Sequence, residues 1–297
     1  MWPRELYLLP IVFFSRATPR FWQRAQNRLA SAVLFRVWDE KTRVLARNLS
    51  VVLGMPEGDP LVRDCVRRLW LNYGFYMLDY VQMNRLGNGG PRHLVPEQIG
   101  IHFVEQALAE GRGGILITPH LGHWELGGVT FAMRGCPIHA LTLRNPEQKV
   151  QRYRDRMRST LGIHSVHIDP NRYDTVLRLA RLLRENRFIA MLGDRWEGGK
   201  HEVVRFFGKN IVFPAGAPAL ALATGSPIIP VFTVMTPKGR YRAWAEPPIQ
   251  VRRRPGMSTP GVIAEATRRL ADVFERIITR YPDQWYHFFD YWERYGR

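Results

Sequence analysis

A histidine and a glutamate five positions apart, His120 and Glu125, are the residues best suited to acid–base chemistry. Two residues at this spacing in one helix lie about 140° apart and do not face each other. If His120 instead lies in the turn between the apolar run 115–117 and a following helix, Glu125 reaches back towards the imidazole from one turn inside. A carboxylate there fixes the histidine tautomer and stabilises its cation. The spacing therefore predicts a general base for a hydroxyl, with no nucleophilic Ser or Cys required.

Two further interpretations of the same residues stand beside this one. A histidine and a glutamate at this spacing often occur by chance as ordinary surface or core residues. A metal site made of His120, His123 and Glu125 is also conceivable, but His-x2-His does not present its imidazoles as a helical i, i+4 zinc pair does. No Cys or His cluster lies near in sequence. We therefore expect no metal.

The elements that must position His120 alternate between helix and strand from about residue 100 onwards. This alternation predicts an α/β fold with a mixed, mostly parallel central sheet and helices on both faces. His120, Arg144 and Asp194-Arg195 each follow a predicted strand directly, so parallel strands bring them to one edge of the sheet. The expected strands are 115–117, 137–143, 165–168, 188–192, 203–207, 228–234 and an edge strand at 241–250.

Capping residues and aromatic residues predict further elements. Asp59-Pro60 begins a helix that extends to about residue 84, and Thr259 caps a closing helix at 261–280. The dense aromatic stretch 285–292 is expected to clasp the core, although an interfacial belt is an alternative.

The first 40 residues have the character of a membrane-associating helical segment. Within 20–37 one stripe repeats Arg every fourth residue, beside an apolar stripe that includes Trp22 and Leu29. A helix lying on a membrane surface and a helix packed on the protein both fit, and the preceding apolar run 6–14 favours the membrane. That run is too short to span a bilayer. We expect residues 1–40 to form this segment and 41–297 to form a single domain.

The composition is strongly basic, with a formal net charge of +17. Of the 43 basic residues, five are Lys and therefore 38 are Arg. The guanidinium of Arg binds two phosphate oxygens at once, which suits anionic lipid headgroups. A GC-rich coding bias is an alternative explanation for the excess of Arg. Nucleic acid is not expected as a partner, because the chain has no zinc-finger spacing and no RNP-like motif. The two cysteines cannot build a disulfide framework and indicate a reducing compartment.

The segment His120-Leu-Gly-His-Trp-Glu125 resembles the His-x4-Asp/Glu signature of bacterial glycolipid acyltransferases. The resemblance is to the lipid A late acyltransferases and the phosphatidylinositol mannoside acyltransferases, and it covers about residues 40–290. Further matching segments occur in the family's order: Arg47-Asn48-Leu49, Gly193-Asp194-Arg195, Phe206-Phe207-Gly208, Phe213-Pro-Ala-Gly216, Ser226–Val231 and Pro282–Trp285.

The resemblance implies site residues as well as an activity. His120 and Glu125 are expected to be catalytic, and Arg144 and Arg158 to contact substrate phosphate, with Arg154 and Arg156 competing with Arg158 for that role. Asp194 is expected to position His120 or an arginine, and Glu197 competes with it. The expected substrate-binding residues are therefore Arg144, Arg158, Asp194, Arg195 and Glu197.

The implied reaction moves a fatty acyl chain from acyl-CoA or an acyl carrier protein to a glycolipid hydroxyl, without metal or redox cofactor. A lipid A precursor or a phosphatidylinositol mannoside is the expected acceptor, at the cytoplasmic face of the bacterial inner membrane. Phe213-Pro-Ala-Gly216 lacks the acidic and basic residues of glycerophosphate acyltransferases, so a lysophospholipid acceptor is less favoured. A thioester hydrolase using the same pair and a basic membrane- or nucleic-acid-binding protein also fit the sequence.

Overall fold

The structure is a computed structural model that describes residues 20–83, 93–143, 148–168 and 173–297. Its centre is a seven-stranded sheet in the order β1-β9-β8-β2-β5-β3-β4. Five strands are parallel; β9 runs antiparallel to β8, and β1 pairs parallel with β9. The strands are β1 Glu97–Ile99, β2 Gly114–Thr118, β3 Ile138–Leu143, β4 Ile163–Ile168, β5 Phe188–Leu192, β8 Ile228–Met235 and β9 Tyr241–Ala245.

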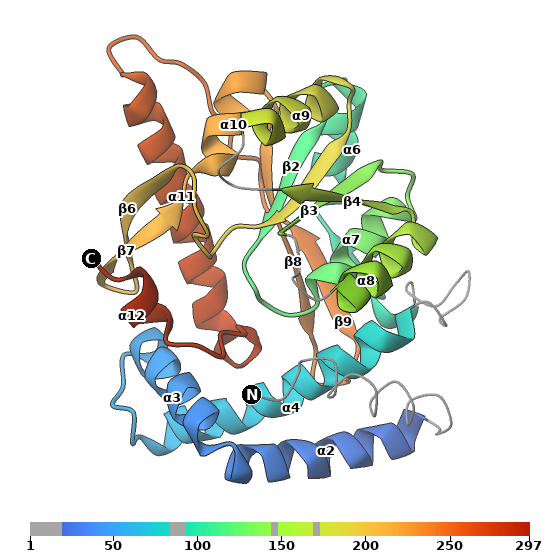
Figure 1. Ribbon diagram of the computed structural model, residues 1–297, viewed down its shortest axis with the longest axis vertical. Coiled ribbons are helices and arrows are strands. Elements are labelled where there is room, and N and C mark those ends of the chain that lie inside the picture. The colour runs from blue at the N-terminus through green and yellow to red at the C-terminus, as the bar shows by residue number, and fades with distance from the viewer. Residues whose placement is uncertain (1–19, 84–92, 144–147, 169–172) are drawn as a thin grey trace.

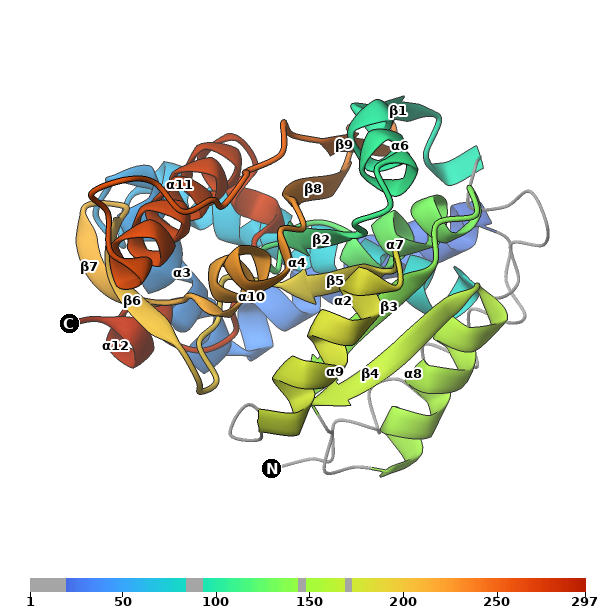
Figure 2. The ribbon, with the colours of Figure 1, turned by 90° about the horizontal axis from the view of Figure 1, so that it is seen from above.

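Helices cover both faces of the sheet, so the predicted fold class is confirmed (Figure 1). Figure 2 shows α8 and α9 on either side of β4. Successive side chains of a strand point to opposite faces. In β2, accordingly, Leu116 packs with the cluster of α4, α6 and α7, while Ile115 and Ile117 pack with α9, α10 and α11. The helices are α2 Arg20–Val37, α3 Asp39–Leu53, α4 Pro60–Gln82, α6 Ile101–Ala109, α7 Trp124–Ala132, α8 Gln148–Thr160, α9 Tyr173–Arg184, α10 Gly216–Thr224, α11 Thr259–Arg280 and α12 Tyr291–Tyr295.

Two details of these elements differ from expectation. Strand β9 is not an edge strand, because β1 pairs along its outer side, and it ends at Ala245, before Pro247-Pro248. Helix α11 is capped by Ser258, whose hydroxyl accepts the N–H of Gly261, so Thr259 is already inside the helix. The cap of α4 is the predicted one: Asp59 accepts the N–H of Leu61, and Pro60 is the first helical residue.

A hairpin and the aromatic C-terminal segment complete the wall beside α11. The hairpin joins β6 (His201–Phe206) to β7 (Lys209–Pro214). After α11 the chain passes through a short 3₁₀ helix, η3 (Pro282–Gln284), and then α12. The aromatic segment is confirmed as a clasp on the core, because Trp285, Tyr286 and Tyr291 are each at most 3% exposed.

Helix α2 packs with an unusual orientation. It lies along α4 at the bottom of the view in Figure 1. The side chains that it buries are polar: Asn27 donates to the carbonyl of Leu71, and Ser31 donates to that of Trp70. Leu34 and Phe35 of α2 are partly buried against the core. Four other apolar side chains face outward, with exposed fractions of 55% for Trp22, 69% for Leu29, 49% for Val33 and 77% for Val37. Within the described part of the chain, no helix is both long and apolar enough to cross a membrane.

Candidate active site

The turn that follows β2 is held on several sides by backbone hydrogen bonds. Tyr286 donates its N–H to the carbonyl of His120, and Gly122 donates to that of Gln284. Gly122 has φ = 62°, and a Cβ there would lie 2.0 Å from the carbonyl oxygen of Thr233, so only glycine fits. The turn is therefore rigid, and it delivers His120 to the carboxyl edge of the sheet.

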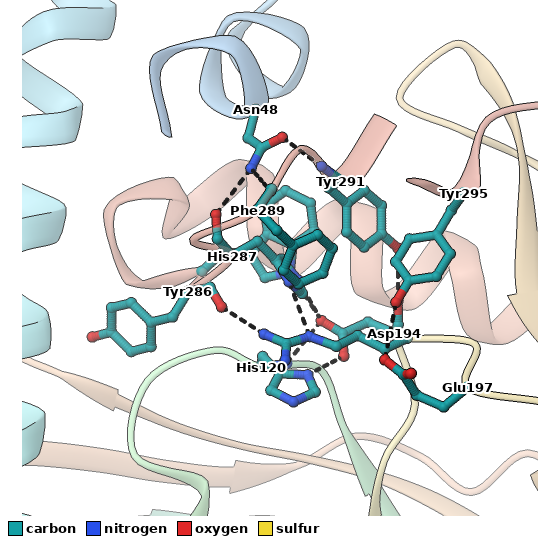
Figure 3. Close-up of polar contacts among 11 residues, drawn as sticks. Asn48, His120, Asp194, Glu197, Tyr286, His287, Phe289, Tyr291 and Tyr295 are labelled. Carbon is teal, nitrogen blue, oxygen red and sulfur yellow. Dashed lines mark hydrogen bonds and ion pairs between the residues drawn. The ribbon is translucent and has the colours of Figure 1, made fainter. Parts of the chain in front are cut away.

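The imidazole of His120 pairs with Asp194, the second residue after β5 (Figure 3). Nδ1 of His120 lies 2.6 Å from Oδ1 of Asp194, and the backbone N–H of His120 donates to Oδ2 over 2.9 Å. Strands β2 and β5 are parallel neighbours, so their ends bring the two residues together across 74 positions of sequence. The expected convergence of His120 and Asp194 on one edge is therefore confirmed.

Asp194 is completely buried and surrounded by N–H donors. Besides the two bonds to His120, its Oδ2 accepts Nε1–H of Trp285 and Nε2–H of His287, each over 3.0 Å. Burial alone would raise the pKa of this carboxyl. The contacts with His120 and His287 outweigh burial, so the pKa lies well below its ordinary value and Asp194 is ionised.

His120 keeps a proton-accepting nitrogen on the cavity side. Burial lowers its pKa below the ordinary histidine value, against the opposing effect of Asp194, so the imidazole is neutral at pH 7. Because Nδ1–H donates to the carboxylate, Nε2 carries the lone pair. Nε2 has no hydrogen-bond partner among the described residues. The side chain of His120 is 15% exposed. This is the arrangement of a general base with an orienting carboxylate.

The cavity that His120 lines has a volume of about 1300 Å³. It lies along both faces of the sheet near the end of β5, because Ala190 and Met191, which point to opposite faces, both line it. The charged residues that line the cavity are Glu125, Arg154, Arg158, Arg195, Glu197, Lys200 and Glu202. Much of the remaining lining is apolar, as a hydrocarbon chain requires.

Glu125 does not make the expected contact with His120. Its carboxylate is held by Arg158, with Nε to Oε2 at 3.0 Å and Nη2 to Oε1 at 2.5 Å, and Arg154 approaches to 3.8 Å. The reason is the start of α7: His123 is the cap, so Glu125 lies in the first turn and points towards α8. Burial would raise the pKa of Glu125, but Arg158 outweighs it and the carboxyl is ionised.

The remaining predicted residues divide into three cases. Arg195 lines the cavity, but its guanidinium donates to Tyr286 and His287. Glu197 also lines the cavity, while its carboxylate pairs with Arg294 and accepts the hydroxyl of Tyr295. Arg144 lies outside the described residues.

Comparison with known proteins gives this site a context. The sequence model described as bacterial lipid A biosynthesis acyltransferase matches residues 5–294. The chain belongs to this family. It is 28% identical over 243 residues to the phosphatidylinositol mannoside acyltransferase of Mycolicibacterium smegmatis, covering 82% of this chain and 76% of that protein. The protein of the same description from Mycobacterium tuberculosis H37Rv is 28% identical over 248 residues, or 82% of this chain and 74% of that protein.

The chain is thus an acyltransferase, an enzyme that needs an acyl donor and a lipid acceptor. One group of potential ligands for a metal ion lies in the described part of this acyltransferase: His120, Asp194 and His287, whose ligand atoms are within 4.8 Å of one another. Asp194, however, already accepts four N–H bonds, and Nδ1 of His287 accepts from Arg195. These donors suit an ionised carboxylate rather than a bound cation. The alternative set of His120, His123 and Glu125 does not come together as a group of ligands in the described residues.

Three residues that hold the site were not predicted to do so. Trp285 and His287 stood in the aromatic stretch that was expected to clasp the core, and Trp285 also ends the matching segment Pro282–Trp285. Asn48 lies in the matching segment Arg47-Asn48-Leu49, and its side chain bonds the carbonyls of His287 and Phe289 and the N–H of Tyr291. A histidine and an indole N–H within that aromatic stretch were the available signal.

Proposed function

We propose that this acyltransferase moves a fatty acyl chain from a thioester, acyl-CoA or an acyl carrier protein, to a hydroxyl of a phosphorylated glycolipid. Nε2 of His120 takes the hydroxyl proton while the oxygen attacks the thioester carbonyl. The tetrahedral adduct then collapses, the C–S bond breaks and the imidazolium returns the proton to the leaving sulfur. Asp194, already ionised, stabilises the transient imidazolium.

One observation carries this proposal: a neutral His120, oriented by a buried carboxylate, lines a large and partly apolar cavity. A hydroxyl becomes a good nucleophile when a base removes its proton during the attack. It can then attack the thioester directly, without a covalent acyl-enzyme. In this assignment Asp194 orients the base, and Glu125 acts on the site through Arg158.

Arg158 supplies the anion-binding group. Its Nε and Nη2 are held by Glu125, while Nη1 is buried and has no hydrogen-bond partner in the described ranges. A guanidinium fixed in this way offers the free N–H groups of Nη1 to a phosphate oxygen without losing side-chain freedom on binding. Arg154 lies beside it. Arg144, outside the described residues, stays a predicted contributor to the same phosphate contact.

The outer face of α2 supports association with a membrane. Trp22, Leu29, Val33 and Val37 fall within roughly 80° of one another around the helix axis. These four side chains are exposed, while Asn27 and Ser31 of the same helix are buried against α4 and Leu34 and Phe35 are partly buried, so α2 presents an uncovered apolar stripe to solvent. A helix with Arg beside this apolar stripe suits the interface of an anionic membrane, and the proposed location is the cytoplasmic face of the inner membrane.

The acceptor is proposed from the relatives, which are described as phosphatidylinositol mannoside acyltransferases, and from the lipid A family description. Purified protein should be incubated with acyl-CoA or acyl carrier protein thioester and each acceptor class in turn, followed by mass spectrometry of the lipids. We expect one acceptor to gain a single acyl chain, and the His120→Ala protein to give none. Thioester consumption that is equally fast without acceptor would identify a hydrolase instead.

A further inference from the structure

The guanidinium of the residue after Asp194 binds the C-terminal segment. Nη2 of Arg195 donates to the carbonyl of Tyr286 over 2.9 Å, and Nε donates to Nδ1 of His287 over 3.1 Å. The guanidinium carbon lies 5.0 Å from the ring centre of Phe289. Two of its nitrogens are thus committed to the protein rather than to a substrate phosphate.

This contact decides which nitrogen of His287 carries the proton. Since Nδ1 accepts from Arg195, the proton of a neutral His287 is on Nε2, which is 3.0 Å from Oδ2 of Asp194 and donates to it. His287 is only 1% exposed, and burial together with Arg195 lowers its pKa to about 3. His287 is therefore a neutral donor at every pH at which the enzyme would work.

We propose that Arg195 and His287 are positioning residues for the base: Arg195 fixes the tautomer of His287, and His287 holds Asp194 so that Oδ1 is left for His120. The proposal rests on the role of His120 as general base. It extends the site from the strand ends to a segment more than 90 residues later in the chain (Figure 3). It also replaces the expectation that Arg195 binds substrate.

The charge of Arg195 has a second effect on His120. The titratable and charged groups that act on His120 are Asp194, Arg195 and Glu197 after β5, and the neutral His287 after η3. Burial is the largest cause of the lowered pKa of His120, Asp194 opposes it, and Arg195 lowers it further. Arg195 thus helps to keep the imidazole unprotonated beside an ionised carboxylate.

The first test is the pH profile of kcat/KM, whose acid limb reports the base of the free enzyme. Arg195→Met removes a cation near His120, so the acid limb should move to higher pH. Arg195→Lys keeps the charge and should leave the limb near its original position while kcat falls, because the two directed bonds are lost. Arg280→Met is the matched control: Arg280 also lies over an aromatic ring, 5.6 Å from the centre of Tyr281, but it is exposed and is not among the groups that act on His120.

The control should superimpose on the wild-type profile. An unmoved acid limb in Arg195→Met would overturn the proposal, and so would a raised KM with unchanged kcat, which is the signature of substrate binding.

The second test separates the hydrogen bonds of His287 from its packing. His287→Gln keeps a donor for Asp194 and an acceptor for Arg195, whereas His287→Leu fills similar space without either. We expect Leu to lower kcat about tenfold to a hundredfold, as for one hydrogen bond lost from a buried charge, and Gln to restore most of it. Equal losses in both variants, at unchanged melting temperature, would show that only the ring shape matters.

Nitrogen NMR of the imidazoles gives a readout without turnover. His287 should remain the Nε2–H tautomer from pH 5 to 9 in the wild type and lose that preference in Arg195→Met. A wild-type His287 protonated on Nδ1 would refute the tautomer assignment. His120→Ala keeps the two failures apart: if that variant stays active, the proposed function itself is wrong, whatever the His287 variants show.

Discussion

At the scale of single residues, the proposed mechanism depends on the protonation states of two neighbours, Asp194 and His120. Asp194 is ionised because four N–H groups point at it, and His120 is neutral because its burial outweighs the nearby carboxylate. Both states are those that proton removal from a hydroxyl requires. Glu125 is ionised too, but its charge is matched by Arg158 rather than directed at the base.

The first prediction concerns the proposed base, His120, and its partner, Asp194. His120→Ala should lose about 10²- to 10⁴-fold in rate, the usual contribution of general-base assistance. Asp194→Asn should lose a similar factor, because an amide N–H facing Nδ1 reverses the tautomer. Since the two act as one unit, the double variant should be little worse than either alone, as measured by kcat under saturating donor.

A histidine control accompanies these variants. His123→Asn keeps an N-cap for α7 and should retain most of the activity. A dead His123→Asn protein with an active His120→Ala protein would mean that the wrong histidine had been assigned.

The second prediction concerns Glu125 and Arg158. Glu125→Gln leaves the buried guanidinium with a neutral partner, so the melting temperature should fall by several degrees and KM for the phosphorylated acceptor should rise. Arg158→Lys should retain little activity, because an ammonium cannot hold Glu125 with two directed bonds and also present a free N–H to the phosphate. The pH profile of either variant should keep its acid limb, in contrast with Arg195→Met. A moved acid limb in Glu125→Gln would instead place Glu125 on the base.

At the scale of elements, the sequence predicted what local patterns determine. Apolar runs marked the strands, and Asp59-Pro60 marked the start of α4. Glu125 was predicted as the partner of His120 because the sequence shows the spacing between the two residues. It does not show that β2 and β5 are neighbours, which is what brings Asp194 to His120. For the same reason β9 was taken for an edge strand, since the outer strand, β1, precedes it by more than 140 residues.

The third prediction concerns α2. Replacing Leu29, Val33 and Val37 by Ser removes three of the four outer apolar side chains and no buried one, so the melting temperature should change little. Binding to liposomes containing anionic lipid, measured by sedimentation, should weaken markedly because the inserted apolar area is lost. The matched control replaces Val203, which is 54% exposed on the hairpin, with Ser and should bind as wild type. Equal binding by the stripe variant would exclude α2 as the docking element.

At the scale of the whole molecule, two buried histidines tie stability to pH. His123 and His287 are 0% and 1% exposed, and burial lowers their pKa values to about 4 and about 3. In the unfolded chain both take up a proton below about pH 6.5. The unfolded state therefore binds more protons than the folded state as the pH falls from 6.5 towards 4, and the free energy of unfolding decreases.

The fourth prediction is the size of that effect. At pH 5 each histidine should cost about 2 kcal/mol of stability relative to pH 7.5, which lowers the melting temperature by several degrees. Scanning calorimetry between pH 7.5 and 5 measures it. His123→Gln cannot titrate, so its melting temperature should depend less steeply on pH. A melting temperature that is constant over this range in the wild type would contradict the buried neutral state.

The bonds between Asp194 and the segment 285–291 also have a consequence for biosynthesis. The hydroxyl of Tyr291 donates to the backbone carbonyl of Asp194, 97 residues earlier in the chain. At ordinary elongation rates the ribosome needs roughly 5 to 20 s to make that interval. During this time a nascent chain has β2 and β5 but no Trp285 or His287 to hold the carboxylate. The contacts that hold Asp194 therefore form only after residues 285–291 have been synthesised, well after both parallel strands.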